Sequence, residues 1–220
     1  MIRLISAALL ASTLSACALS PQMIDIVPKP EVVTRNAGNN EAVSVSTVDQ
    51  RNRPEFGTRG GVYGDTSLPR ASNDMPGAIT LAVRQGLQQQ GFNAYNPAGG
   101  AAELEVRVVE FSYVPEEGSV VNRVEVKTEL HAVARNNRGD EFRGVYRAGN
   151  TYEQPLTPSA KRNKMMLNEV LDRLVGDPPE HADALREVRA AIAALAADIA
   201  AAELEATVPL AVVHPALAAL

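Results

Sequence analysis

Hydrophobic and polar residues alternate along several segments of the chain, which predicts β-strands with one buried and one solvated face. The clearest alternation runs from Val120 to Ala134. Its apolar side carries Val124, Val126, Leu130, Ala132 and Ala134, and its polar side carries Arg123, Glu125, Lys127, Glu129 and His131. Such a pattern is typical of an antiparallel sheet that is covered on one side only. Residues 43–48 alternate in the same way and predict an earlier strand.

The segment from Leu104 to Tyr113 predicts a long strand in which the apolar phase changes. Leu104, Val106 and Val108 share one face, and the phase then slips to Val109, Phe111 and Tyr113. A one-residue slip turns every later side chain to the other face, so we expect a β-bulge or bend near Val108. A short strand is predicted over 92–95, and residues 136–140 predict a hairpin turn before a returning strand with Phe142, Tyr146 and Ala148.

Two segments have helical spacing. Asp74 and Pro76 indicate a helix start, Gly91 indicates its end, and the apolar positions between them are Ile79, Ala82, Val83, Gly86 and Leu87. A second helix is predicted to begin at Thr157-Pro158 and to end at Gly176, with the stripe Met166, Leu167, Val170, Leu171 and Leu174. The order of elements predicts an α+β domain over 42–179, with a mostly antiparallel sheet of four or five strands and two helices on one face.

Residues 180–220 predict a helical extension and an apolar tail. The residues Leu185, Val188, Ile192, Leu195, Ile199 and Ala202 are spaced three and four apart, as in the seam of a coiled coil. One interpretation is a homodimer through the 185–202 helix. The alternative is a third helix that folds back on the domain, because fewer than three heptads seldom hold a coiled coil unaided.

The N-terminus carries Arg3, an apolar run from Leu4 to Leu14, and then Leu14-Ser15-Ala16-Cys17. Eleven residues are too few to span a bilayer, so the segment predicts a signal peptide. The four residues that end at Cys17, the only cysteine, resemble the lipobox of bacterial lipoproteins. That resemblance implies a signal peptide over 1–16, acylation of Cys17 and a membrane attachment through the N-terminal lipid. An ordinary secretory signal is the alternative. The prolines, the glycine and the weak periodicity of the following segment predict a tether over 17–41.

Ala18 follows the cysteine. In lipoproteins of this type an aspartate at that position commonly retains the protein in the inner membrane, so the resemblance implies the outer membrane, facing the periplasm. Removal of residues 1–16 takes away one positive charge and changes the formal net charge from -5 to -6. This charge gives no support for nucleic acid as a partner.

Candidate chemistry is sparse. The loop that contains Gly57, Gly60, Gly61 and Gly64 carries four arginines, which form a candidate anion-binding site: Arg51, Arg53, Arg59 and Arg70. Lys161, Arg162 and Lys164 crowd the predicted start of the second helix, where the helix dipole disfavours cations. Both groups could instead be solvated surface charge. The three histidines show no metal-ligand spacing, and no catalytic motif is present, so we expect no cofactor and no enzymatic activity.

The chain resembles the YajG-like family of bacterial lipoproteins over roughly residues 1–180. The matching segments are Asp49-Gln50-Arg51, the loop 57–64, residues 87–92 and the strand with Tyr146. The family is functionally uncharacterised, so the resemblance implies little about activity. Together these features predict a non-enzymatic, lipid-anchored periplasmic module that binds a protein partner in envelope assembly or maintenance. A carrier or sensor of an anionic envelope lipid or glycan is the alternative, and a hydrolase is a distant third.

Overall fold

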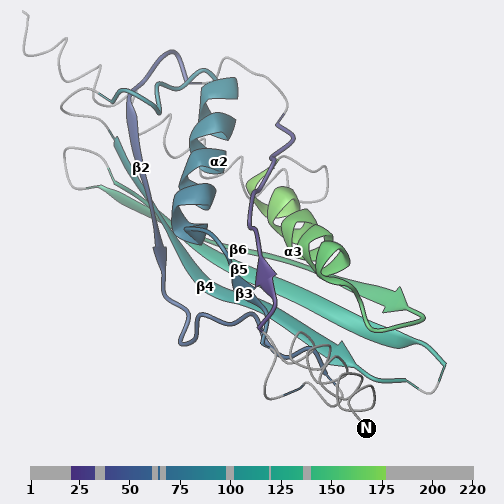
Figure 1. Ribbon diagram of the computed structural model, residues 1–220. Coiled ribbons are helices and arrows are strands. Elements are labelled where there is room, and N and C mark those ends of the chain that lie inside the picture. The colour runs from purple at the N-terminus through teal and green to yellow at the C-terminus, as the bar shows by residue number, and fades with distance from the viewer. Residues whose placement is uncertain are drawn as a thin grey trace, which may run out of the picture.

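A four-stranded sheet forms the base of the structure (Figure 1). The computed structural model describes residues 21–32, 38–60, 64, 68–97, 102–118, 120–135 and 140–176. The strands lie in the order β2-β4-β5-β6 and comprise β2 (Val43–Asp49), β4 (Ala102–Glu116), β5 (Asn122–Arg135) and β6 (Glu141–Gln154). The β4–β5 and β5–β6 pairs are antiparallel, whereas β2 is parallel to β4. The predicted α+β class and the mostly antiparallel sheet are confirmed.

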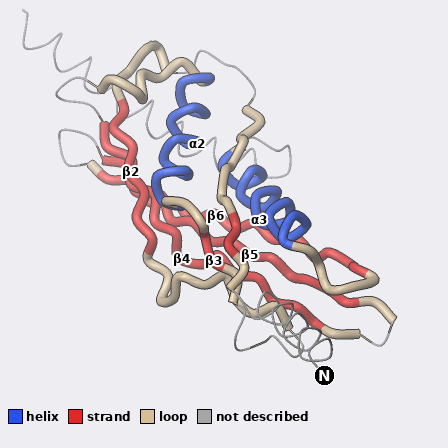
Figure 2. Tube along the Cα trace, in the orientation of Figure 1, coloured by secondary structure: helices blue, strands red, loops and turns tan. Residues whose placement is uncertain are grey.

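Both helices cover the same face of this sheet, as Figure 2 shows. Helix α2 (Met75–Gln89) begins after Asp74, whose side chain accepts a hydrogen bond from the Gly77 backbone. Helix α3 (Ala160–Val175) is capped in the same way by Ser159, two residues after the predicted start. Helix α2 connects the parallel strands β2 and β4, because a parallel pair needs a crossover that returns the chain to the same edge.

The core lies between the helices and the apolar side of the sheet. It includes the predicted residues of β5, the stripe of α3 and most of the stripe of α2. The bulge is confirmed, since the β4–β5 register shifts between Val108 and Glu110. Phe111 and Tyr113 are therefore buried like Val108, and the Thr128 hydroxyl donates to the Glu110 backbone oxygen at 3.0 Å. The bulge keeps both halves of β4 facing the core.

Residues 21–32, which we call the strap, correct the predicted tether. The strap (purple in Figure 1) runs between α2 and α3, and its β1 (Met23–Ile24) pairs in parallel with β3 (Arg70–Ala71). Ile24 and Ile26 are fully buried against the helices. Two isoleucines spaced two apart on an extended segment bury enough apolar surface to hold it on the domain. The folded unit therefore begins before residue 42.

Residues 92–95 do not form the predicted strand. Phe92 and Ala94 are buried, but Asn93 makes only a single bridge to Ala42. The turn at 136–139, the extension over 180–220 and Cys17 lie outside the described residues, so the predictions on them stay predictions.

Candidate functional site

Arg51 lies two residues after the end of β2. Its Nε and Nη2 donate to the two carboxylate oxygens of Asp49 at 2.9 and 2.8 Å, and its backbone N–H donates to the same carboxylate at 3.1 Å. The guanidinium lies 5.1 Å from the ring centroid of Phe56, and only 8% of the side chain is exposed. Partial burial works to raise the pKa of Asp49, but the Arg51 hydrogen bonds and charge outweigh it and lower that pKa.

The other three arginines of the candidate anion site lie in different surroundings. Arg70 forms an ion pair with Glu55, fifteen residues earlier in the chain. Arg59 lies near enough to Tyr113 for its charge to act on the phenol. Arg53 is exposed.

An open groove of about 700 Å³ separates this loop from residues 109–112 of β4. Arg51 and Arg53 line the groove together with Phe56 and Thr58, and Arg59 and Arg70 do not. The structure therefore brings two of the four predicted arginines to one groove, and Arg51 reaches it with its charge balanced by Asp49. Anion binding by these residues stays a prediction.

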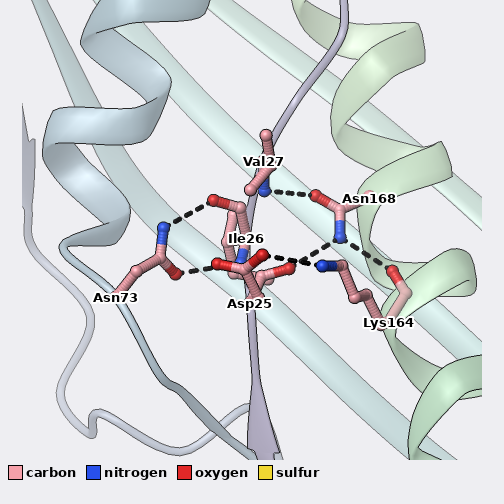
Figure 3. Close-up of polar contacts among 6 residues, drawn as sticks. All are labelled: Asp25, Ile26, Val27, Asn73, Lys164 and Asn168. Carbon is pink, nitrogen blue, oxygen red and sulfur yellow. Dashed lines mark hydrogen bonds and ion pairs between the residues drawn. The ribbon is translucent and has the colours of Figure 1, made fainter.

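The strap is held by asparagine side chains from both sides, as Figure 3 shows. Asn73 accepts from the Ile26 N–H at 2.9 Å and donates to the Ile26 carbonyl at 2.7 Å. Asn168 of α3 accepts from the Val27 N–H at 2.7 Å and donates to the Asp25 carbonyl at 3.0 Å. These side chains serve the strap backbone as a neighbouring strand would.

The sequence alone does not single out these two asparagines. Asn73 precedes the Asp74 cap, where a polar residue is ordinary at the start of a helix. Asn168 lies outside the apolar stripe of α3. Neither position gives a local signal, because the partner of each is more than forty residues away in the chain.

The start of the strap is fixed by a buried polar chain. The Tyr113 hydroxyl donates to Asn163 Oδ1 at 2.9 Å, and Asn163 Nδ2 donates to Gln22 Oε1 at 2.6 Å. The Gln22 carbonyl also accepts from the Arg70 N–H at 2.9 Å. Burial raises the pKa of Tyr113 to about 12, against the smaller opposing effects of the Arg59 charge and the Asn163 hydrogen bond. Gln22 is thus attached to both β3 and α3.

The first five residues of α3 include three cations beside this point. Lys161 and Lys164 are exposed, Lys164 Nζ lies 2.7 Å from Asp25, and the Arg162 guanidinium lies 5.6 Å from the centroid of the Tyr152 ring. The first turn holds no acidic residue. Cations at a helix N-terminus oppose the helix dipole by about 0.3–1 kcal/mol each, so helix stability does not account for them.

The apolar space between the helices and the sheet is small. A cavity of about 60 Å³ lies between α2, α3 and strands β4 to β6, with Leu87, Leu174 and Tyr146 among its lining residues. An apolar cavity that binds one benzene molecule has a volume of about 150 Å³. This cavity is therefore too small for a lipid acyl chain.

The described residues offer no metal site, since they contain no group of three or more His, Cys, Asp or Glu side chains arranged to hold an ion. None of the helices described is long and apolar enough to cross a membrane.

A family model described as "Uncharacterized lipoprotein" matches residues 28–177. The chain belongs to this lipoprotein family. The wider resemblance to lipoproteins is thereby confirmed, and the narrower YajG-like placement stays a prediction. The family description names no activity, which agrees with the expected lack of one without demonstrating it. A search of curated proteins found no match.

Solved structures with a similar arrangement include a protein from Xanthomonas campestris and a minor lipoprotein from Acinetobacter baumannii. The first is 13% identical with a TM-score of 0.43, and the alignment covers 70% of this chain and 92% of that chain. The second is 12% identical with a TM-score of 0.41, and the alignment covers 70% of this chain and 94% of that chain. At these TM-scores neither structure supports an inference about this member of the lipoprotein family.

Proposed function

We propose that this lipoprotein is a non-enzymatic module, anchored through acylated Cys17, that binds a protein partner in the cell envelope with its outer surface. The observation that carries the proposal is the strap. Ile24 and Ile26 fill the space between α2 and α3, where a carrier of an apolar ligand would keep its cargo, and the remaining cavity is about 60 Å³. We therefore place partner binding on the outer surfaces of the domain.

Two open surfaces suit a protein partner. One is the groove beside residues 109–112, which lies where β2 has ended and β4 continues. The other is the uncovered face of the sheet, where arginines, lysines and glutamates are paired across strands, as in Arg147 with Glu129 and Arg123 with Glu153. Arrays of paired charge favour specific recognition by a complementary surface over insertion of an apolar ligand.

The alternative function is a carrier or sensor of an anionic lipid or glycan that uses Arg51, Arg53, Arg59 and Arg70. The structure offers less support for it, because Asp49 and Glu55 balance the charges of Arg51 and Arg70. A hydrolase has the least support, since no catalytic group of side chains faces either surface of the described domain. Placement among YajG-like lipoproteins, with attachment to the outer membrane facing the periplasm, belongs to the same proposal.

Cys17→Ala tests the anchor. The substitution should move the protein from the membrane fraction to the aqueous fraction of lysed cells, because no second acylation site is available on a chain with one cysteine. Circular dichroism should show unchanged folding, since the strap is fixed to the domain from Gln22 onwards. Retention of the variant in the membrane fraction would contradict a lipid anchor.

In-cell photo-crosslinking tests the partner. A crosslinking residue in place of Arg53 samples the groove, one in place of Val145 samples the uncovered sheet face, and one in place of Leu81 on exposed α2 surface is the control. One dominant envelope protein, captured from the first or second position and not from the control, is the expected result. Capture of lipid or glycan in its place would favour the alternative function.

A further inference from the structure

The strap leaves little chain between the domain and its lipid. Residue 21 is the first residue described, and Gln22 is attached to Arg70 and Asn163. Three residues lie between Cys17 and residue 21, and the four Cα-to-Cα steps span at most about 14 Å when fully extended. A lipid on Cys17 therefore brings the surface around Gln22 close to the membrane, whereas a tether that ran to residue 41 would leave the domain free to turn.

The surface around Gln22 carries an excess of positive charge. Arg70, Lys161, Arg162 and Lys164 lie beside it, where Arg70 pairs with Glu55 and Lys164 pairs with Asp25. Lys29, Glu169 and Asp172 line the same hollow, and Glu169 pairs with Arg173, so the cations still outnumber the carboxylates. Lys161 is exposed in the first turn of α3. Exposed cations within a Debye length of an anionic leaflet are attracted to it.

Large apolar side chains are exposed on β1, on the start of α3 and on the loop that leads into α3. Leu156, four residues before α3, is 76% exposed, Met23 of β1 is 57% exposed and Met165 of α3 is 47% exposed. Apolar side chains interspersed with lysine and arginine are the composition of surfaces that bind the interface of a bilayer. We name these residues, Met23, Leu156, Lys161, Arg162, Lys164 and Met165, the anchor-side patch.

We propose that the anchor-side patch docks on the anionic phospholipid headgroups of the membrane that holds the lipid. This inference rests on the proposed acylation of Cys17. Docking fixes the orientation of the domain, with the strap and the start of α3 against the bilayer. Arg162 contacts Tyr152 near the end of β6, whereas Val145 lies near the start of β6. The part of the uncovered sheet face around Val145 then points away from the bilayer, toward a partner. Docking also gives a role to the cations at the start of α3, which the helix dipole disfavours.

The test uses the full-length lipidated protein in vesicles of phosphatidylethanolamine with phosphatidylglycerol, and in vesicles of phosphatidylcholine alone. Acylation consumes the only native thiol, so a fluorophore can be attached to Leu156→Cys in the patch or to the matched control Val145→Cys on the uncovered sheet face. Headgroup-nitroxide lipids then quench whichever label lies near the bilayer. We expect quenching at position 156 to exceed that at position 145 several-fold in the anionic vesicles, and the difference to shrink in phosphatidylcholine.

A charge variant separates docking from folding. Lys161→Gln should lower the ratio of docked to undocked protein about fivefold in anionic vesicles, since a cation near such a surface contributes about that factor. The same substitution removes an unfavourable charge from the N-terminus of α3, so the melting temperature of the variant should equal or exceed that of the unsubstituted protein. A loss of quenching with no loss of stability supports docking.

Three results would overturn the proposal, and each overturns a different part of it. If the protein floats with the vesicles but both labels are quenched equally, the domain is anchored and does not dock. If the protein fails to float with the vesicles at all, the acylation of Cys17 is wrong, and the docking falls with it. Equal docking in anionic and phosphatidylcholine vesicles would overturn recognition of the anionic headgroup.

Discussion

At the scale of single residues, polar side chains occupy core positions and are satisfied there by partners far along the chain. Asn163 lies on the buried side of α3, only 1% exposed, and bonds Tyr113 and Gln22. A buried amide without partners would cost about 1–3 kcal/mol. The pair with Tyr113 therefore links the sheet, the helix and the strap at one point.

The tyrosines predict an alkaline limit to stability. Burial raises the pKa of Tyr113, and likewise that of Tyr152, to about 12, whereas a tyrosine in the unfolded chain titrates near 10.0. Above pH 10 the unfolded state loses these protons first, so the free energy of unfolding should fall as pH rises from 10 towards 12. Urea titrations at pH 9, 10 and 11 measure this slope. Tyr113→Phe should flatten it, and Tyr95→Phe, at an exposed position, is the control that should leave it unchanged.

At the scale of elements, the strap behaves as a strand whose neighbours are side chains. Asn73 and Asn168 each bond its backbone twice, on opposite sides. Ile24 and Ile26 supply the apolar contact, and the amides supply the register. Both kinds of contact stabilise the strap in its place between the helices.

Loss of the amides should loosen the strap. Asn73→Ala and Asn168→Ala each leave backbone groups of residues 25–27 unpaired, at a cost of about 1–3 kcal/mol in the free energy of unfolding. Amide hydrogen exchange of the strap should accelerate in both variants more than exchange of β5. Asn52→Ala, which removes the same amide from an exposed loop, is the control. Unchanged strap exchange in both variants would show that the isoleucines hold it alone.

At the scale of the whole molecule, the sheet has one buried apolar face, which both helices cover, and one exposed face of charged side chains. Val126 is fully buried on the first, and Val145 is 48% exposed on the second. Glu129 is flanked by His131 and Arg147, and hydrogen bonds from Arg147 and then His131 lower its pKa. Nothing in the described part of the chain covers this second face.

Lysine substitutions on the two faces should differ sharply. Val145→Lys should change the free energy of unfolding by less than about 0.5 kcal/mol, since surface substitutions seldom do more. Val126→Lys should unfold the domain, because a buried unpaired charge costs several kcal/mol against a total stability of about 5–15 kcal/mol. Thermal unfolding followed by circular dichroism measures both. A large loss in Val145→Lys would mean that another segment or a second copy covers the charged face.

The family match confirms that the chain is a lipoprotein, but it does not test the narrower YajG-like placement. The match over residues 28–177 confirms a lipoprotein, as the lipobox resemblance implied. The four arginines could not be assigned from their spacing, because a sequence does not tell which carboxylate each arginine meets. Asp49 and Arg51 are neighbours and could be weighed as a pair, but Glu55 meets Arg70 only because β3 returns beside the loop.

The sequence by itself determined the elements whose causes are local. Asp74 caps a helix through a bond to the next turn, the alternation along β5 separates its two faces, and the phase change at Val108 requires a bulge. Only the tertiary structure decided the parallel pairing of β2 with β4, the course of the strap and the burial of Asn163. Each of these depends on contacts between segments that are far apart in the chain. The burial and hydrogen bonds that stabilise such contacts cannot be predicted from a short stretch of sequence.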